Sequence, residues 1–116
     1  SGFSMKIVHI DIGNDFSKVL GPRYRKDGDF SGEDFRERVL VPHFRDQSVD
    51  RVVVHLDSLS GYSASFMEEA FGGLVRLFGL DVVNKKLQFD AVRRRYLVPK
   101  IVEWMDDAAE PEQPRG

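Results

Sequence analysis

Residues 51–79 read RVVVHLDSLSGYSASFMEEAFGGLVRLFG, and this stretch decides the fold class. Its first part, Arg51–Leu56, is an almost uninterrupted β-branched run, which is typical of a buried central strand. A loop with four serines follows. From Ser65 onward, apolar residues recur with the period of an amphipathic helix, and Gly79 is a typical stop signal. A buried strand, a loop and a helix in this order predict part of an α/β domain.

The segments on either side continue the alternation of strands and helices. Lys6–Ile12 alternates between apolar and polar residues, which predicts a strand with one apolar face. A helix should begin at Ser31, because its hydroxyl can cap the first turn, and Pro42 should kink or end that helix. The other expected elements are strands at Leu80–Val83 and Leu87–Phe89, a helix from Val92 to Met105, and a short helix or strand at Phe16–Leu20.

The composition narrows the class of protein. The chain has 116 residues with 17 basic and 19 acidic side chains, a net charge of −2, so a protein built mainly to coat nucleic acid is not expected. It contains no cysteine, which removes disulfides, zinc–thiolate sites and cysteine nucleophiles. No apolar run approaches the roughly 18 residues of a membrane helix. We therefore expect a cytoplasmic protein with no cofactor, no membrane association and no direct nucleic-acid partner.

One domain should span residues 5–105. Residues 1–4 precede Met5 and read as a remnant of cloning rather than as part of the fold. Residues 106–116 contain two prolines and several acidic residues but nothing to bury, so we expect a disordered acidic tail there. A domain of this length buries roughly two-thirds of its unfolded surface, so it can form one core without a disulfide or metal.

Two histidines, His9 and His55, lie on predicted strands and are flanked by apolar residues. If these strands pair, the imidazoles could meet each other and a carboxylate, either Asp11 or Asp57. That arrangement would suit a small enzyme or anion-binding protein that uses His9, His55 and Asp57. A hydrogen-bonded pair with a structural role is the simpler interpretation. No metal site and no catalytic residue is assigned, because no spacing motif such as His-Glu-x-x-His is present.

The serines before the long helix allow two interpretations. Ser65 stands three residues before Glu68, which is the spacing of a capping box. A serine at a helix N-terminus is also a suitable phosphate acceptor, because free backbone amides and the helix dipole stabilise negative charge. Glu68 and Glu69 would repel such a phosphate. The residues alone favour the cap.

Basic residues gather in two places. Arg23, Arg25 and Lys26 lie in one loop, and Arg93–Arg95 lie at the expected start of the last helix. Either group could be a solvated surface or could face an anion or an acidic partner. The cations at the helix start oppose the helix dipole, which slightly favours a partner there.

The pattern as a whole resembles a known family. The segments that carry the resemblance are Val52-Val53-Val54-His55-Leu56-Asp57, Ser63-Ala64-Ser65-Phe66-Met67-Glu68-Glu69-Ala70-Phe71-Gly72-Gly73-Leu74 and, upstream, Gly21-Pro22-Arg23-Tyr24-Arg25, Gly28, Phe30-Ser31-Gly32-Glu33 and Phe35-Arg36. Together they resemble the STAS-like family of bacterial domains, small relatives of the anti-sigma factor antagonists. The resemblance implies a single-domain α/β fold with a small mixed β-sheet flanked by about three α-helices.

The resemblance also implies a function. Such domains are non-enzymatic regulatory protein-interaction modules, and classical members bind a GHKL-type serine kinase that is also an anti-sigma factor until phosphorylation of one serine releases them. Ser65 is the best positional match to that serine and Ser63 is the second candidate, although the acidic residue and the glycine of the classical motif are replaced here. The rival hypothesis is a phosphorylation-independent structural module or homo-oligomer. The residues expected to bind the partner are Asp57, Ser58, Ser60, Tyr62, Glu68, Glu69, Arg23 and Arg25.

Overall fold

The computed structural model describes residues 4–111. At its centre is a sheet of three strands in the order β1-β2-β3: β1 (Ile7–Asp11), β2 (Arg51–His55) and β3 (Leu87–Asp90). Both pairings are parallel. The α/β prediction is confirmed, and the β-branched run is the central strand. The described strands are all parallel rather than mixed.

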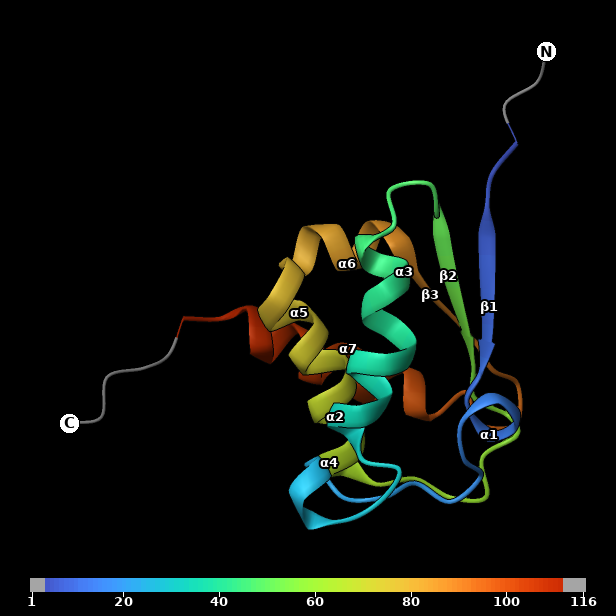
Figure 1. Ribbon diagram of the computed structural model, residues 1–116, viewed down its shortest axis with the longest axis vertical. Coiled ribbons are helices and arrows are strands. Elements are labelled where there is room, and N and C mark those ends of the chain that lie inside the picture. The colour runs from blue at the N-terminus through green and yellow to red at the C-terminus, as the bar shows by residue number, and fades with distance from the viewer. Residues whose placement is uncertain (1–3, 112–116) are drawn as a thin grey trace.

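Helices form the second layer (Figure 1). Two of them are long rods that are each interrupted by a π-type turn, and a third helix follows β3. The first rod comprises α2 (Gly32–Phe35), η2 (Arg36–Leu40) and α3 (Val41–Arg45); the second comprises α4 (Ala64–Met67), η3 (Glu68–Gly72) and α5 (Gly73–Phe78); the third helix is α7 (Leu97–Ala109). The shorter elements are α1 (Ile12–Asp15), the 3-10 turn η1 (Arg25–Asp27) and α6 (Leu80–Lys86).

Pro42 does not end the first rod, which continues to Arg45. The proline lies in the first turn of α3, directly after the wider π-type turn η2. Proline lacks a backbone N–H, so it fits best where the regular hydrogen-bond ladder is already shifted. Phe44 therefore stays on the buried side of the rod, as its helical spacing predicted.

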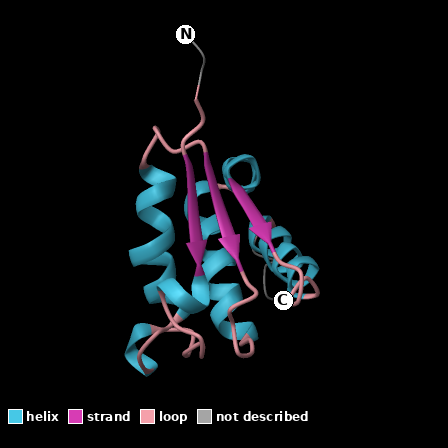
Figure 2. Ribbon diagram, turned by 90° about the vertical axis from the view of Figure 1, so that its right-hand side faces the viewer, coloured by secondary structure: helices cyan, strands magenta, loops and turns pink. Residues whose placement is uncertain are grey.

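The rods cover one face of the sheet, and Figure 2 shows the other face with the helices behind it. Alternate strand residues point to opposite faces, so Ile10, Val52 and Val54 are buried in the core while Ile7 faces solvent. All-parallel sheets usually have both faces covered. The other face here carries the exposed polar side chains of His9 and Gln88, with Val53 between them at 7% exposure.

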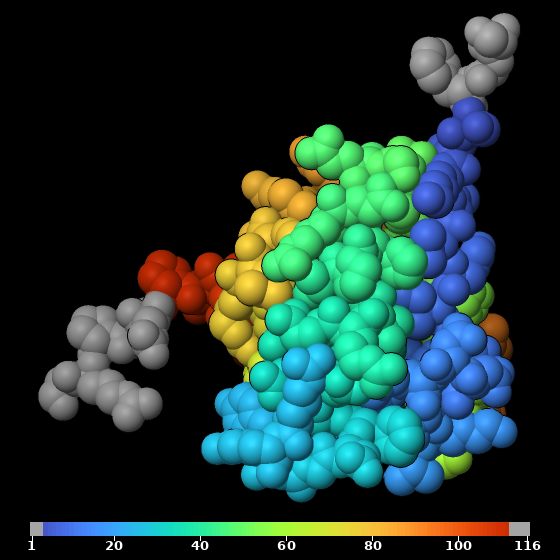
Figure 3. Space-filling view, viewed as in Figure 1, coloured from blue at the N-terminus to red at the C-terminus, as the bar shows by residue number. Residues whose placement is uncertain are grey.

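The loop of residues 21–30 packs against the start of the first rod (Figure 3). Gly21 N–H donates to the carbonyl of Phe30, and the N–H of Gly32 donates to the carbonyl of Pro22. A Cβ on Gly21 would lie 2.1 Å from the carbonyl oxygen of Asp29, so only glycine allows this approach. The Gly-Pro pair of the upstream motif thus fixes how the chain enters α2.

One predicted strand is wrong. Leu80–Val83 lies in helix α6, after Gly79 turns the chain with φ +88°. Within this segment Val83 is buried but Val82 is 47% exposed. When only one residue in each helical turn is buried, the segment has the pattern of a surface helix rather than of a strand with an apolar face.

The limits of the last helix also differ from the prediction. It begins at Leu97 rather than Val92, because residues 92–96 are held in turns, and it continues to Ala109. Residues 106–109 are therefore helical rather than part of a disordered tail. Phe16–Leu20 forms neither a helix nor a strand, and its first N–H groups close the turn after α1 on the carbonyl of Ile12. Residues 1–3 and 112–116, where the remnant and most of the tail were placed, lie outside the described residues.

The two rods cross where Gly32 meets the backbone of Phe66. A Cβ on Gly32 would lie 2.4 Å from the carbonyl oxygen of Phe66, which is backbone and cannot move away easily. We expect Gly32→Ala to lower the free energy of unfolding by about 1–3 kcal/mol, because overpacking forces the rods apart. Gly61→Ala is the matched control, since nothing lies within 4 Å of its added methyl group. Urea denaturation of both variants measures the difference, and equal stabilities would contradict the close crossing.

Candidate functional site

The three strands end at the same edge of the sheet, at the lower end in Figure 1. The segments that follow them, residues 12–20, 56–63 and 91–96, therefore gather there. In open α/β sheets, ligands bind outside the carboxyl ends of the strands. Four of the residues predicted to bind a partner lie in the middle segment: Asp57, Ser58, Ser60 and Tyr62.

Ser58 joins the first two segments. Its hydroxyl donates to the carboxylate of Asp11 at the end of β1, and it accepts the N–H of Gly13 at 3.0 Å. The same carboxylate caps α1 by accepting the N–H of Asn14. The hydrogen bond from Ser58 is the main reason why the pKa of Asp11 lies below its usual range. Ser58 thus has a structural role within the predicted docking region, because it links the segment after β2 to the segment after β1.

Asp57 joins the last two segments. Its carboxylate accepts the N–H of Arg94 at 2.8 Å and the N–H of Val92 at 2.9 Å. These backbone donors, first Arg94 and then Val92, lower the pKa of Asp57. They also hold residues 92–96 in turns, which explains why α7 starts later than its apolar periodicity predicted. Asp57 therefore shapes the site from inside.

Two arginines of the third segment reach back to the middle one. Arg93 donates to the carbonyl oxygens of Asp57 at 2.6 Å and Leu59 at 3.1 Å. Arg94 donates to the same Leu59 carbonyl at 2.9 Å and to the hydroxyl of Tyr96 at 2.7 Å. The sequence predicted that this basic cluster begins a helix. Instead it precedes α7, and Arg93 and Arg94 act as a clamp that holds the loop after β2 through these hydrogen bonds.

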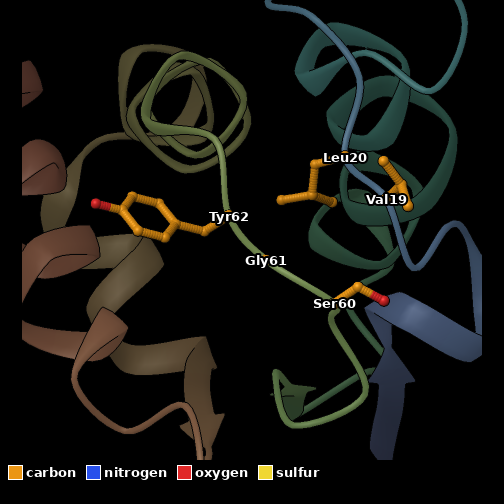
Figure 4. Close-up of a pocket in the computed structure, with 5 residues that line it drawn as sticks. All are labelled: Val19, Leu20, Ser60, Gly61 and Tyr62. Atoms are coloured by element: carbon orange, nitrogen blue, oxygen red, sulfur yellow. The ribbon is translucent and has the colours of Figure 1, made fainter.

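A small pocket opens between the first and middle segments (Figure 4). It has a volume of about 250 Å³ and is lined by Val19, Leu20, Ser60, Gly61 and Tyr62; we call it the Tyr62 pocket. Val19 is 72% exposed and Tyr62 is 44% exposed. In Figure 4 the Leu20 side chain points toward the backbone of Gly61, while the ring of Tyr62 points the other way. Ser60 and Tyr62 were predicted from the sequence as partner-binding residues, whereas Val19 and Leu20 were not.

Ser63, rather than Ser65, caps the helix that follows the pocket. Its hydroxyl accepts the N–H of Phe66 at 3.3 Å, and the Ser65 hydroxyl lies 3.2 Å from that of Ser63. Ser65 thus occupies the first turn. The predicted capping box does not form, because the carboxylate of Glu68 binds arginines instead.

Glu68 and Glu69 are held in a network of ion pairs. Arg23 lies 2.5 Å from Glu68, Arg76 lies 2.8 Å from Glu68, and Arg36 lies 2.5 Å from Glu69. Burial tends to raise the pKa of Glu68, but the hydrogen bonds from Arg76 and Arg23 outweigh it, and the pKa is lowered. Both carboxylates are thus paired with arginines within the fold.

Arg25, also predicted to bind a partner, is paired with acidic residues of α2 rather than placed at the carboxyl end of the sheet. Its Nε is 2.9 Å from the carboxylate of Asp34, and its backbone N–H donates to Glu33. The eight residues predicted as one docking face therefore fall into two groups. Four lie at the carboxyl end of the sheet, and the others are paired within the helical layer and its loop.

His9 and His55 meet on the open face of the sheet. Nδ1 of His9 is 2.9 Å from Nε2 of His55, and Nδ1 of His55 is 3.0 Å from the carboxylate of Asp90. The ring centroids are 5.1 Å apart, so the imidazoles lie end to end with nitrogen facing nitrogen. This hydrogen-bonded chain crosses all three strands, and it uses Asp90 rather than Asp11 or Asp57. Within residues 4–111, no group of three or more His, Cys, Asp or Glu side chains is arranged to hold a metal ion.

The sequence of the chain matches a known protein family. Residues 31–92, from the N-cap of α2 to the turn after β3, match the family described as STAS-like domain of unknown function (DUF4325). The chain belongs to this STAS-like family. The matched region of the STAS-like domain includes β2, β3, both rods and the serines before α4. No curated protein and no solved structure matches the chain. Every helix in the described part of the STAS-like domain is too short or too polar to traverse a lipid bilayer.

The hydrogen bonds of Asp57 predict a pH dependence. Because its pKa is lower in the folded state than in the unfolded chain, the carboxylate stabilises the fold above about pH 4, and this contribution is lost as the pH falls through the folded pKa. We expect Asp57→Asn to be less stable than wild type at pH 7 and to lose less stability between about pH 5 and pH 2. Urea denaturation across this range measures both effects. Asp106→Asn is the control, and a variant at Asp57 with the wild-type pH profile would contradict the assignment.

Proposed function

We propose that this STAS-like domain is a non-enzymatic regulatory module that binds a protein partner at the carboxyl end of its sheet, and that a phosphate on Ser65 switches this binding. The observation that carries the proposal is the position of the Tyr62 pocket, an exposed apolar hollow whose last lining residue comes three residues before a serine in the first turn of a helix. An enzyme is less well supported, because His9, His55 and Asp90 lie on the open sheet face and do not line the Tyr62 pocket.

The Tyr62 pocket has the character of a docking site. Apolar side chains that are this exposed gain free energy when a partner covers them. The walls are held by hydrogen bonds between segments, including the N–H of Ser60 to the carbonyl of Lys18 and the arginine clamp on Leu59. A partner would therefore meet a preformed surface, which lowers the entropic cost of binding.

Ser65 suits the role of the modified serine better than Ser63. Ser63 already accepts the N–H of Phe66 as the helix cap, whereas the only side chain hydrogen-bonded to Ser65 within the described residues is that of Ser63. A phosphate in the first helical turn is favoured by the free amides and the helix dipole. The repulsion expected from Glu68 and Glu69 is reduced, because arginines neutralise both carboxylates.

The partner implied by the family resemblance is a GHKL-type serine kinase that also acts as an anti-sigma factor. A phosphate adds about −1.5 to −2 charges at pH 7 within a few residues of the pocket. Such a charge would repel an acidic docking segment and release it. A phosphorylation-independent structural module is the rival, and it predicts binding that ignores the charge of residue 65.

Capture from cells of the native host tests the switch. We expect wild type and Ser65→Ala to recover the same partner. Ser65→Asp should recover an amount of this partner that is lower by about tenfold or more. Val82→Asp is the matched control, because it places one negative charge at an exposed position on α6, away from the pocket. Urea denaturation should show that all these variants remain folded.

Phosphopeptide mass spectrometry of the recovered wild-type domain completes this test. Phosphate on Ser65 is the expected result. Phosphate on Ser63 alone would move the switch to the cap residue. Equal recovery by Ser65→Asp and wild type, with both serines unmodified, would replace the switch by the structural module.

A further inference from the structure

The cations near the Tyr62 pocket, on the side of the loop toward which the Tyr62 ring points, lack the carboxylate partners that other arginines of the domain have. Arg93, Arg94 and Lys100 donate to neutral oxygens: carbonyls of Asp57 and Leu59, and the hydroxyls of Tyr96 and Tyr62. None of the three forms an ion pair with any side chain of residues 4–111. Their positive charge is therefore presented to the surroundings of the pocket.

Three carboxylates at this end of the sheet accept hydrogen bonds from backbone N–H groups. Asp11 and Asp57 accept the N–H groups of Asn14, Val92 and Arg94. Asp15 accepts the N–H of Asp11 at 2.7 Å. These hydrogen bonds are made to backbone donors, and the charge of Arg93 makes a smaller contribution to the lowered pKa of Asp57. The chain carries a net charge of −2, so the positive character of this end is local.

From this arrangement we infer that the Tyr62 pocket binds an acidic polypeptide segment that carries one large apolar side chain. The apolar side chain enters the pocket between Leu20 and Gly61, and neighbouring carboxylates pair with Lys100 and Arg94. The inference rests on the proposed function, because it names the chemistry of the partner for the same surface.

The size of the pocket fits a single side chain. Its volume of about 250 Å³ is below the roughly 300–1,000 Å³ of a site for a small-molecule ligand. Val19 and Leu20 supply apolar contact on one side, and the backbone of Gly61 leaves room on the other. An apolar anchor surrounded by charged contacts is the usual composition of such an interface.

A nucleic acid is the other polyanion that could approach these cations. Single-stranded nucleic acids bind by stacking bases on exposed aromatic faces. The ring of Tyr62 is not free for this, because Nζ of Lys100 lies 4.9 Å from its centroid and Tyr96 packs against it edge-on, with ring centroids 6.5 Å apart. An acidic polypeptide needs no such face. Repulsion between the carboxylates of such a segment and a phosphate on Ser65 explains why phosphorylation would weaken binding.

Titration with defined peptides tests the inference by NMR. The first peptide has one leucine flanked by glutamates, the second has alanine in place of leucine, and the third has lysines in place of the glutamates. We expect the first peptide to bind about tenfold more tightly than either of the others, since several charge pairs and one buried side chain each contribute modestly. Chemical-shift changes should be confined to residues 17–20, 58–63 and 93–100.

Two variants separate the pocket from general charge effects. Lys100→Gln should weaken binding of the first peptide several-fold, and Lys85→Gln, at an exposed position on α6, should leave it unchanged. Equal binding of all three peptides, or shifts outside these segments, would overturn the inference. Tighter binding of a duplex or single-stranded oligonucleotide at the same residues would replace the polypeptide by nucleic acid. If the peptides fail but Ser65→Asp still loses its partner from cells, the proposed function stands and only the acidic segment is rejected.

Discussion

The parallel direction of β1, β2 and β3 is the constraint on which the rest of this structure depends. Parallel neighbours cannot be joined by a tight turn, so each connection must return along the sheet as a helix. Both connections return on the same face, which builds the core there and leaves the other face open. The three following segments must then meet at one edge. Ser58 ties the first segment to the second, Asp57 ties the second to the third, and the Tyr62 pocket is the space that these ties leave.

Charged side chains are arranged differently in the helical layer and at the carboxyl end of the sheet. In the helical layer, Glu68 and Glu69 are neutralised by arginines, and this network joins the two rods where Gly32 lets them approach. Ion pairs of this kind give little net stability, but loss of one partner leaves a half-buried charge. At the carboxyl end of the sheet, Arg94 and Lys100 hold neutral oxygens and keep their charge available. The first arrangement joins the two rods, and the second is the one that we propose for recognition.

The sequence was most informative where one local signal dominated. The β-branched run of β2 and the apolar stripe of the second rod predicted the central strand and its covering helix. Local patterns failed where a distant group decided the outcome: Asp57 delays the start of α7, and the arginines withdraw Glu68 from the capping box. Asp90 joins His9 and His55 only because β3 pairs beside β2, which no spacing in the sequence reveals. Val19 carries no local signal, since an exposed valine in a loop is ordinary until its neighbours are known.

We propose that the carboxyl end of the sheet is the surface that meets a partner. Photocrosslinking in cells of the native host tests it most directly, with a photoreactive amino acid at position 19 beside the pocket or at position 82 on α6. Both side chains are exposed and apolar in the natural sequence, so neither replacement should disturb the core. We expect a crosslinked protein partner from position 19 and none from position 82. A partner captured at position 82 but not at position 19 would instead place the recognition surface on the helical layer.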